Sequence, residues 1–385
     1  MSELQILLNE EHFDQLELSN YSRSVADVIL KFHKTFKEYS VTPLHRLDAM
    51  ASKLGVQRIY VKDESFRFGL NAFKILGGSY AIGSWLKEHP DKKDVVFVTA
   101  TDGNHGRGVA WAAKAMGCKA VVYMPKGTTK ERFENIRALG ADVSIEDFSY
   151  DECVRLARTN AEKYGWVIVQ DTAWDGYEDI PLRIMQGYMT LSNEAASQME
   201  DMGDIPVPSH IFAQAGVGSA AASVIAFFCA LAKEKGLPMP KSIVVEPDSA
   251  NCIYLSAQNR RRSFVSGEMN SIMAGLCCGE PCTIAWDILK DACGAFVSCG
   301  DEITMDGMRL LAHPCGNDPK IISGESGAVT CGMLNKLMTD DNLSEYRKAL
   351  GLGSESRVLL ISTEGDTDKE SYNRIVGELK QTAEK

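Results

Sequence analysis

Short runs of β-branched and other apolar residues alternate with longer segments of helical period along nearly the whole chain. The short runs, expected to be strands, are residues 58–61, 95–98, 120–123, 167–169, 210–212, 243–245 and 358–361. The longer segments, expected to be helices, are residues 75–87, 106–116, 130–139, 151–164, 184–199 and 220–235. Near-continuous apolar strands separated by helices are typical of parallel sheets that are covered on both faces. We therefore predict an α/β fold with right-handed crossovers.

The 385 residues fit two domains, or one large α/β domain with an insertion, and no low-complexity linker divides them. The best breaks are the Pro- and Gly-containing stretches at residues 89–91 and 176–181. They bracket about four strand–helix repeats. The sequence thus predicts a smaller domain of residues 93–186, inserted in a larger domain formed by residues 1–92 and 187–385.

Charge and hydropathy argue against several classes of partner. The formal net charge is −11, and the one short basic block is residues 260–262, which we expect to be a solvated loop. No nucleic-acid partner is therefore expected. No apolar run approaches the ~20 residues of a membrane helix, and residues 1–5 do not begin a secretory signal. We expect a cytoplasmic protein with no membrane partner.

The chain has eleven cysteines, but none of them form a CxxC pair. Eight lie between Cys252 and Cys331 without the ligand spacing of a zinc site, so no metal is expected. In the absence of a secretory signal we expect reduced thiols. A local disulfide or redox pair among Cys252, Cys277, Cys278 and Cys282 remains an alternative.

Lys74 is the first candidate for chemistry. It opens an apolar helix between Phe73 and Ile75, so its side chain is expected to be partly buried. A lysine amine attacks a carbonyl only when it is deprotonated, which burial or a neighbouring cation promotes. Taken alone, the position favours the alternative, a solvated lysine at a helix start.

Residues 101–106 form a glycine-containing loop between a predicted strand and a predicted helix. Backbone N–H groups and the helix dipole favour an anion at such a junction. The natural ligand is the α-carboxylate of an amino acid, and the amide of Asn104 can face a ring oxygen. The substrate-binding candidates in this loop are Thr101, Asp102, Gly103 and His105. Many α/β loops look alike, so the loop by itself is weak evidence.

A second loop, residues 214–219, follows another predicted strand. Gly216, Val217, Gly218 and Ser219 at a helix start suit a phosphate. A dinucleotide loop would need a third glycine, which is missing here, and a plain tight turn is the other alternative.

The predicted strand 358–361 ends in the hydroxyl residues Ser362 and Thr363. Open parallel sheets bind ligands at the carboxyl ends of their strands, so either hydroxyl could bind a heterocycle nitrogen. The alternative is a helix cap just downstream, at Asp366 or Thr367. The two interpretations are compatible.

Longer runs are more specific than these short motifs: residues 42–44, 62–74, 101–108, 170–174, 321–327 and 362–368. On these runs the chain resembles the fold-type II pyridoxal-phosphate (PLP) enzymes, the group of threonine dehydratase, serine racemase and tryptophan synthase β. Within that group it looks like the diaminopropionate ammonia-lyases across nearly its whole length. The resemblance implies two open, mostly parallel twisted sheets with helices on both faces. It also implies a smaller domain inserted in a larger one, PLP as cofactor, an amino-acid substrate and a homodimer.

The resemblance also implies roles for single residues. Lys74 would hold PLP as a Schiff base, Asn104 would contact the phenolic oxygen, and residues 216–219 would bind the phosphate. Ser362 or Thr363 would face the pyridine nitrogen, where a neutral hydroxyl fits elimination better than racemisation or transamination. The implied reaction is the α,β-elimination of ammonia from 2,3-diaminopropionate. It gives aminoacrylate, then pyruvate and a second ammonia.

Three residues are expected to handle the substrate. Lys74 is the expected base for the L isomer, and Asp102 for the D isomer from the opposite face. A carboxylate base needs a raised pKa, which burial beside the cofactor could provide. Dehydratases usually have a small hydroxyl residue at the position of Asp102, whose alternative role is a helix cap. Asp171, which follows the predicted strand 167–169, is expected to hold the distal ammonium, with loop capping as its alternative.

Two other functions remain open at this point. One is a serine or threonine dehydratase of the same fold. The other is a catalytically inactive ligand sensor, which usually lacks the Schiff-base lysine that this chain retains at Lys74.

Overall fold

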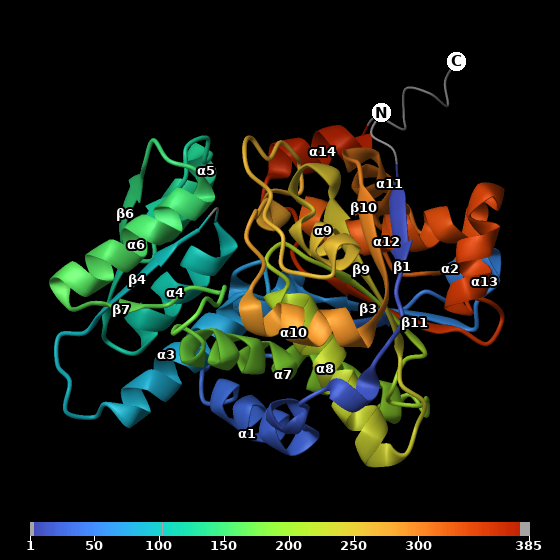
Figure 1. Ribbon diagram of the computed structural model, residues 1–385, viewed down its shortest axis with the longest axis horizontal. Coiled ribbons are helices and arrows are strands. Elements are labelled where there is room, and N and C mark those ends of the chain that lie inside the picture. Colours follow the sequence, from blue (N-terminus) through green and yellow to red (C-terminus); the bar gives the residue numbers. More distant parts are fainter. Residues whose placement is uncertain (1–3, 102, 378–385) are drawn as a thin grey trace.

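The computed structural model describes residues 4–101 and 103–377, whose strands form two separate sheets (Figure 1). The larger sheet contains, in spatial order, β1 (Gln5–Leu8), β10 (Cys293–Cys299), β9 (Lys241–Pro247), β8 (His210–Gln214), β11 (Arg357–Ser362), β3 (Arg58–Asp63) and β2 (Leu44–Arg46). The smaller sheet contains, in spatial order, β6 (Asp142–Ile145), β5 (Lys119–Met124), β4 (Val96–Ala100) and β7 (Val167–Ile168). The smaller sheet is parallel throughout, and in the larger one only the edge strands β1 and β2 are antiparallel to their neighbours. Two mostly parallel sheets confirm the predicted fold class.

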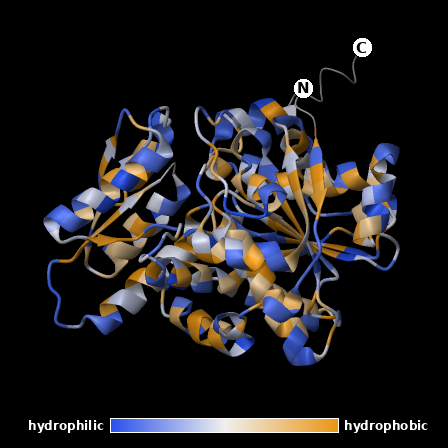
Figure 2. Cartoon of the chain, viewed as in Figure 1, coloured by the Kyte–Doolittle hydropathy of each residue, from blue (hydrophilic) through white to orange (hydrophobic). Residues whose placement is uncertain are grey.

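Helices cover both faces of the larger sheet because successive strand residues point to opposite sides. In β11, Leu359 and Ile361 join one apolar core, whereas Val358 and Leu360 join another. The first core includes α1 (Arg23–His33), α3 (Ile75–Glu88), α7 (Asp179–Asp201), α8 (Ser219–Lys235), α9 (Cys252–Asn259) and α10 (Thr283–Ala292). The second includes α2 (Asp48–Leu54), α11 (Asp301–Ala312), α12 (Glu325–Thr339), α13 (Ser344–Leu350) and α14 (Lys369–Gly377). Figure 2 shows the apolar strands between helices with polar outer surfaces.

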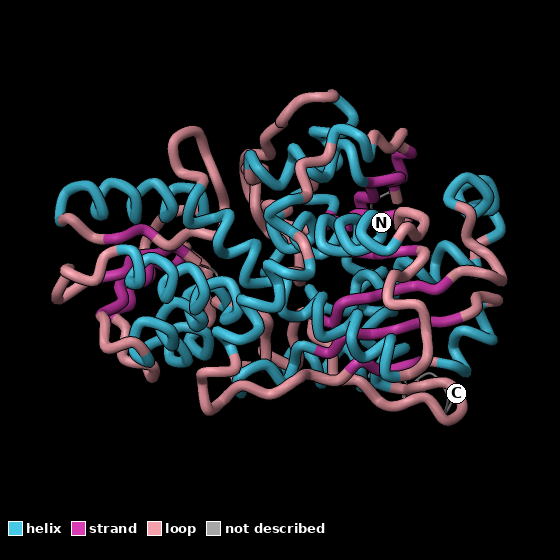
Figure 3. Tube along the Cα trace, turned by 90° about the horizontal axis from the view of Figure 1, so that it is seen from below, coloured by secondary structure: helices cyan, strands magenta, loops and turns pink. Residues whose placement is uncertain are grey.

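The smaller sheet is covered in the same way. Its helices are α4 (Asn104–Ala115), α5 (Lys130–Arg137) and α6 (Tyr150–Tyr164). Val98 and Ala100 of β4 pack with α6, whereas Phe97 points to the opposite side and joins the core that contains α4. Seen from below, the strands of the two sheets form two groups with helices between them (Figure 3). Short 3-10 turns lie at Phe13–Gln15, Ser19–Tyr21, Glu64–Gly69, Asp248–Ala250, Ala274–Leu276 and Asp341–Leu343.

The division of the chain between the two sheets bears on the predicted domain boundaries. The four strands of the smaller sheet all lie between residues 96 and 168. Helix α7, however, runs without a break from Asp179 to Asp201 and packs on α1, α3 and α8. A boundary at residue 186 would cut this helix, so we propose that the smaller domain ends before Asp179. None of the described helices is both long enough and apolar enough to cross a membrane.

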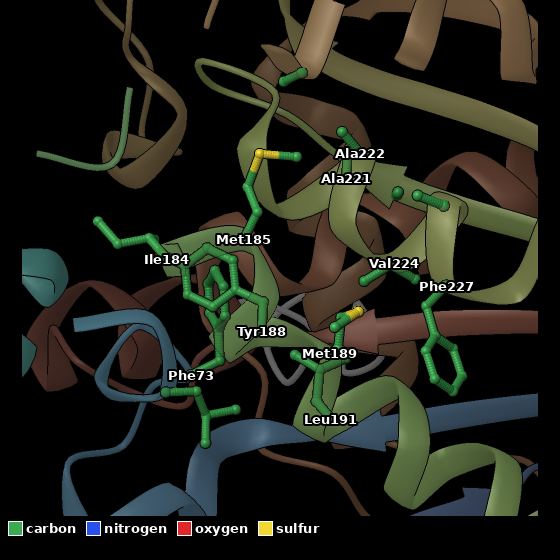
Figure 4. Close-up of a cluster of buried hydrophobic side chains, with 14 of the residues drawn as sticks. Phe73, Ile184, Met185, Tyr188, Met189, Leu191, Ala221, Ala222, Val224 and Phe227 are labelled. Atoms are coloured by element: carbon green, nitrogen blue, oxygen red, sulfur yellow. The ribbon is translucent and has the colours of Figure 1, made fainter. Parts of the chain in front are cut away.

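Close packing of α3 against α7 fixes the start of α3, where Lys74 lies. A Cβ on Gly77 would lie 2.6 Å from the ring of Tyr188, and one on Gly187 would overlap the carbonyl oxygen of Leu76. Two glycines thus let the helix backbones approach. The rings of Phe73 and Tyr188 lie 4.7 Å apart between centroids, within the apolar cluster of Figure 4. The residue before Lys74 is therefore anchored in the core.

Candidate active site

A pocket of about 720 Å³, partly open to solvent, lies at the carboxyl ends of strands from both sheets. Parallel strands in register end at the same edge, where ligands bind in open α/β sheets. Leu360 of the interior strand β11 pairs with Val61 of β3 and Phe212 of β8, so the loops after these strands meet here. The predicted residues that line the pocket are Lys74, Thr101, Asn104, His105, Asp171, Gly216, Val217, Gly218, Ser219 and Thr363.

Two predicted residues of the described part of the chain, Ser362 and Gly103, are not among those that line this pocket. The side chain of Ser362 is buried, and its hydroxyl donates a hydrogen bond to Ser323 Oγ at 2.8 Å. Gly103 lines a smaller polar pocket next to the first one. Asp102 lies outside the described residues. Of the two hydroxyls at the end of β11, the one that lines the pocket is therefore that of Thr363, which accepts a hydrogen bond from Gln214 Nε2 at 3.1 Å.

Lys74 forms an ion pair with Asp171 inside the pocket. The Lys74 Nζ–Asp171 Oδ2 distance is 2.5 Å, and the two side chains are 20% and 5% exposed. Burial alone would raise the pKa of the Asp171 carboxyl, but the nearby His105 and Lys74 outweigh burial and lower this pKa to about 2. The structure thus brings together two residues that are 97 positions apart in the sequence.

Asp171 also contacts other polar groups of the pocket. The His105 ring places Nδ1 3.8 Å from Asp171 Oδ2, while its Nε2 hydrogen-bonds the Val169 carbonyl at 2.8 Å. A carbonyl only accepts, so the ring proton on that side belongs to Nε2. The Tyr150 hydroxyl donates to Asp171 Oδ1 at 3.5 Å, and Ser219 Oγ donates to the Asp171 carbonyl at 2.7 Å. Asp171 therefore connects the lysine to the glycine loop.

Residues 216–219 have the geometry of an anion cradle. Gly218 has φ = +95°, a conformation that favours glycine, and Ser219 begins the 17-residue helix α8. A Cβ on Gly216 would lie 3.2 Å from Cys278 Sγ, a tight contact, so a side chain there would crowd the turn. Free N–H groups at a helix start bind phosphate. Because this cradle shares a pocket with Lys74, the residues present fit PLP.

Sequence analysis missed several polar residues of the pocket, among them Glu364 and Tyr150. Glu364 accepts a hydrogen bond from Asn104 Nδ2 at 2.5 Å. It lies just after a predicted strand, so its place at a carboxyl end could have pointed to it. The Tyr150 hydroxyl accepts from Gln170 Nε2 at 2.8 Å, and no sequence signal singles out Tyr150. The remaining lining residues are Phe73, Tyr188, Gln214, Ala215, Ala220, Gly275, Leu276, Cys278 and Ser326.

The cysteines around the glycine loop are thiols in this structure. All eleven cysteines lie in the described residues and none of them forms a disulfide bond; Cys278 is part of the pocket wall. Cys252 Sγ lies 3.6 Å from the Gly216 carbonyl oxygen, and burial raises its pKa well above the usual value. Within residues 4–101 and 103–377, no cluster of three or more His, Cys, Asp or Glu side chains could hold a metal ion.

The sequence model of one enzyme family, the pyridoxal-phosphate dependent enzymes, matches residues 35–364. The chain belongs to this family. Diaminopropionate ammonia-lyase from Salmonella typhimurium is 49% identical over 381 residues, which cover 93% of each chain. The enzyme of the same name from Escherichia coli K12 is 47% identical over 373 residues, covering 93% of this chain and 92% of its own.

Solved structures of this PLP-dependent family agree with the sequence match. The crystal structure of Escherichia coli diaminopropionate ammonia-lyase in complex with an aminoacrylate-PLP azomethine reaction intermediate has a TM-score of 0.91. Its identity is 44%, and the match covers 99% of this chain and 98% of that one. Threonine deaminase isoform 2 from Solanum lycopersicum, with a TM-score of 0.74 and 21% identity, shares the fold. The fold-type II architecture expected from the resemblance is confirmed.

Proposed function

We propose that this protein is a diaminopropionate ammonia-lyase. The reaction would convert 2,3-diaminopropionate and water to pyruvate and two molecules of ammonia. The observation that carries the proposal is the meeting of Lys74 with the glycine cradle 216–219 in one pocket. This arrangement occurs in a chain 49% identical, over 93% of its length, to an enzyme of that name.

When bound, PLP supplies an electron sink for the negative charge that develops when the α-proton leaves. Lys74 would hold it covalently, and residues 216–219 would bind its phosphate. Asn104 would face the phenolic oxygen. Of the two candidates for the partner of the pyridine nitrogen, Ser362 and Thr363, we propose Thr363, since it lines the pocket and the Ser362 hydroxyl is bonded to Ser323.

The proton-transfer roles are divided between a lysine and two carboxylates. Lys74, released when substrate takes its place, would remove the α-proton of the L isomer. Asp102, outside the described residues, would act on the D isomer from the opposite face. Asp171 would hold the distal ammonium of the substrate, because its carboxylate already pairs with the ammonium of Lys74 at 2.5 Å. That amine leaves readily only when protonated, and a carboxylate of low pKa favours the protonated form.

Activity on both isomers is part of the proposal. Related Escherichia coli diaminopropionate ammonia-lyase, 43% identical to this chain, has been solved in complex with D-serine. That complex supports a pocket that admits a D amino acid. We expect the Asp102→Ser variant to lose turnover of D-diaminopropionate and to retain turnover of the L isomer.

A serine or threonine dehydratase is the nearest alternative. The biosynthetic L-threonine dehydratase of Haemophilus influenzae is 29% identical over 220 residues, 57% of this chain and 38% of its own. The lyases match at higher identity over a much longer stretch. An inactive sensor is disfavoured by the retained Lys74 and its ion pair.

Pyruvate release separates these functions. The purified protein with PLP is given D- or L-diaminopropionate, serine or threonine, and pyruvate is measured with lactate dehydrogenase. 2-Oxobutyrate from threonine is measured separately. The proposal expects rapid pyruvate release from diaminopropionate, and none from the Lys74→Ala variant. Faster turnover of serine or threonine would establish a dehydratase. A protein that forms no borohydride-trapped adduct on Lys74 would be no enzyme of this kind.

A cytoplasmic location and a homodimer also belong to the proposal, and the homodimer rests on the resemblance. Size-exclusion chromatography with light scattering on the PLP-loaded protein would test the dimer. A mass near the 42.2 kDa of one chain would exclude it.

A further inference from the structure

Glu364 lines the pocket and forms hydrogen bonds to residues on both sides of it. It follows the interior strand β11 of the larger sheet, and its side chain is buried. One carboxylate oxygen accepts from Asn104 Nδ2 at 2.5 Å, and the other accepts from the Ser326 backbone N–H at 3.1 Å. Asn104 begins helix α4 beside the smaller sheet. A single buried carboxylate thus joins the two parts of the molecule, 260 positions apart in sequence.

The chemistry of the carboxylate fixes the orientation of the Asn104 amide. A carboxylate can only accept hydrogen bonds, so the nitrogen of the amide must face Glu364. The amide nitrogen carries two hydrogens, and Glu364 takes one of them. Asn104 also lines the active-site pocket. The second hydrogen of the amide is therefore free to serve as a donor to a ligand there.

The backbone around Glu364 is itself held in place. Its carbonyl accepts from the Gly324 N–H at 3.0 Å, just before helix α12, and Ser326 lies in the first turn of that helix. The helix dipole favours a negative charge at this end. Glu364 also forms a β-bridge with Ala72, two residues before Lys74. The position of the Glu364 carboxylate is therefore fixed, so that its hydrogen bond can orient the Asn104 amide.

We propose that Glu364 is a positioning residue that orients the Asn104 amide toward the phenolic oxygen of PLP. The inference rests on the proposed function, because it takes the contact between Asn104 and PLP from there. Glu364 itself would act through Asn104 and not on the reacting atoms.

A charge effect is the competing explanation. Arg107 lies three positions after Asn104 in the same helix and lines, with Glu364, the small polar pocket of about 310 Å³. Burial lowers the pKa of the Arg107 guanidinium, and the charges of Glu131 and Glu364 oppose this effect. Glu364 could therefore serve only as a counter-charge for Arg107. The two explanations predict different results for a variant that keeps the negative charge on a shorter side chain, which no longer reaches Asn104.

Four variants separate the explanations: Glu364→Gln, Glu364→Asp, Asn104→Ala and the double variant Asn104→Ala/Glu364→Gln. Glutamine offers one oxygen to two donors, and aspartate keeps the charge on a shorter side chain. The apo forms are titrated with PLP, and the dissociation constant and the visible Schiff-base absorption band are recorded. Asp318→Asn is the matched control, since Asp318 accepts from the Ala49 and Met50 N–H groups at a helix start away from this pocket.

We expect Glu364→Gln and Glu364→Asp each to weaken PLP binding by about 3- to 10-fold, the equivalent of one lost hydrogen bond. Both should shift the absorption band, and the double variant should bind PLP no more weakly than Asn104→Ala alone. The control should match the wild type. These expectations are tested by PLP binding and absorption spectra alone, so the tests do not depend on a measurement of turnover.

Three results would overturn the inference. One is a Glu364→Asp variant that behaves as wild type, which would leave only the counter-charge for Arg107. Another is a Glu364→Gln effect of the same size with and without Asn104. The third is a wild-type band unchanged in every Glu364 variant. If the wild type itself forms no Schiff base with PLP, the proposed function fails together with the inference. A wild type that binds PLP and releases pyruvate isolates a failure of the inference.

Discussion

Replacing Asp171 with asparagine tests the electrostatics of the pocket most directly. The substitution keeps the size of the side chain and removes the charge that pairs with Lys74 and faces His105. The pKa of the Asp171 carboxyl falls from 3.8 to about 2 in the folded protein. One pKa unit corresponds to about 1.4 kcal/mol, so the ionised carboxylate stabilises the folded apoenzyme by about 2 kcal/mol. Hydrogen bonds to charged groups contribute a similar amount, about 1.5–3 kcal/mol.

The sign of the pH dependence follows from the lowered pKa. A carboxyl with a lower pKa in the folded state contributes its full stability above the unfolded pKa near 4 and loses it as pH falls toward 2. At pH 7 the Asp171→Asn variant should therefore be about 2 kcal/mol less stable than the wild type. By pH 3 about 1 kcal/mol of that difference should have disappeared.

Urea unfolding of the two apo proteins, followed by circular dichroism from pH 7 to pH 3, measures this difference. Other acidic groups titrate in both proteins and cancel in the comparison. Asp147→Asn is the control, because Asp147 pairs with Lys126 at 2.9 Å on the surface, where a pair contributes little. The reasoning would be refuted by an Asp171→Asn variant as stable as the wild type at pH 7. A stability gap that stays constant down to pH 3 would refute it as well.

Three further changes test the cradle, the ring contact and the interior. Gly216→Ala places a Cβ 3.2 Å from a cysteine sulfur and should weaken PLP binding at least about 10-fold by fluorescence titration, whereas Gly353→Ala, with open space around its Cβ, should not. Thr363→Val should lower the rate of pyruvate release with little change in the melting temperature. Ser362→Ala should lower the melting temperature with little change in that rate. Lys62→Met leaves a buried glutamate partner without its ammonium and should cost about 3–5 kcal/mol of stability in urea unfolding.

The fold was predictable wherever the apolar pattern was strong and local. The seven predicted strands and six predicted helices all occur, most with ends shifted by one to five residues. Strand β10 (Cys293–Cys299) was not predicted, since its cysteine, glycine and alanine residues have a weak strand signal. It is a strand because it lies buried between β1 and β9, a tertiary effect that local sequence does not carry. The short edge strands β1 and β2, both antiparallel to their neighbours, and the parallel edge strand β6 were missed as well.

The candidate site was predictable to the extent that its groups come from one loop. The cradle 216–219 is a local strand–loop–helix motif, and the structure places it in the pocket as expected. Asp171, a candidate from the sequence, also lines the pocket, but its pairing with Lys74 joins two distant segments, and neither segment alone predicts it. Glu364 was missed for the same reason, because its partner Asn104 lies 260 positions away.

Both missed pairings connect one sheet to the other, and this has a consequence for the chemistry. Lys74 and Glu364 come from loops of the larger sheet, whereas Asp171 and Asn104 come from loops of the smaller one. The Lys74–Asp171 and Asn104–Glu364 pairs therefore hold the two halves of the pocket together. A lysine nitrogen that enters a covalent bond with an aldehyde can no longer pair with Asp171 as a free ammonium. If Lys74 holds PLP covalently, as proposed, more of the alignment between the halves would rest on Glu364, since its carboxylate would take no part in that bond.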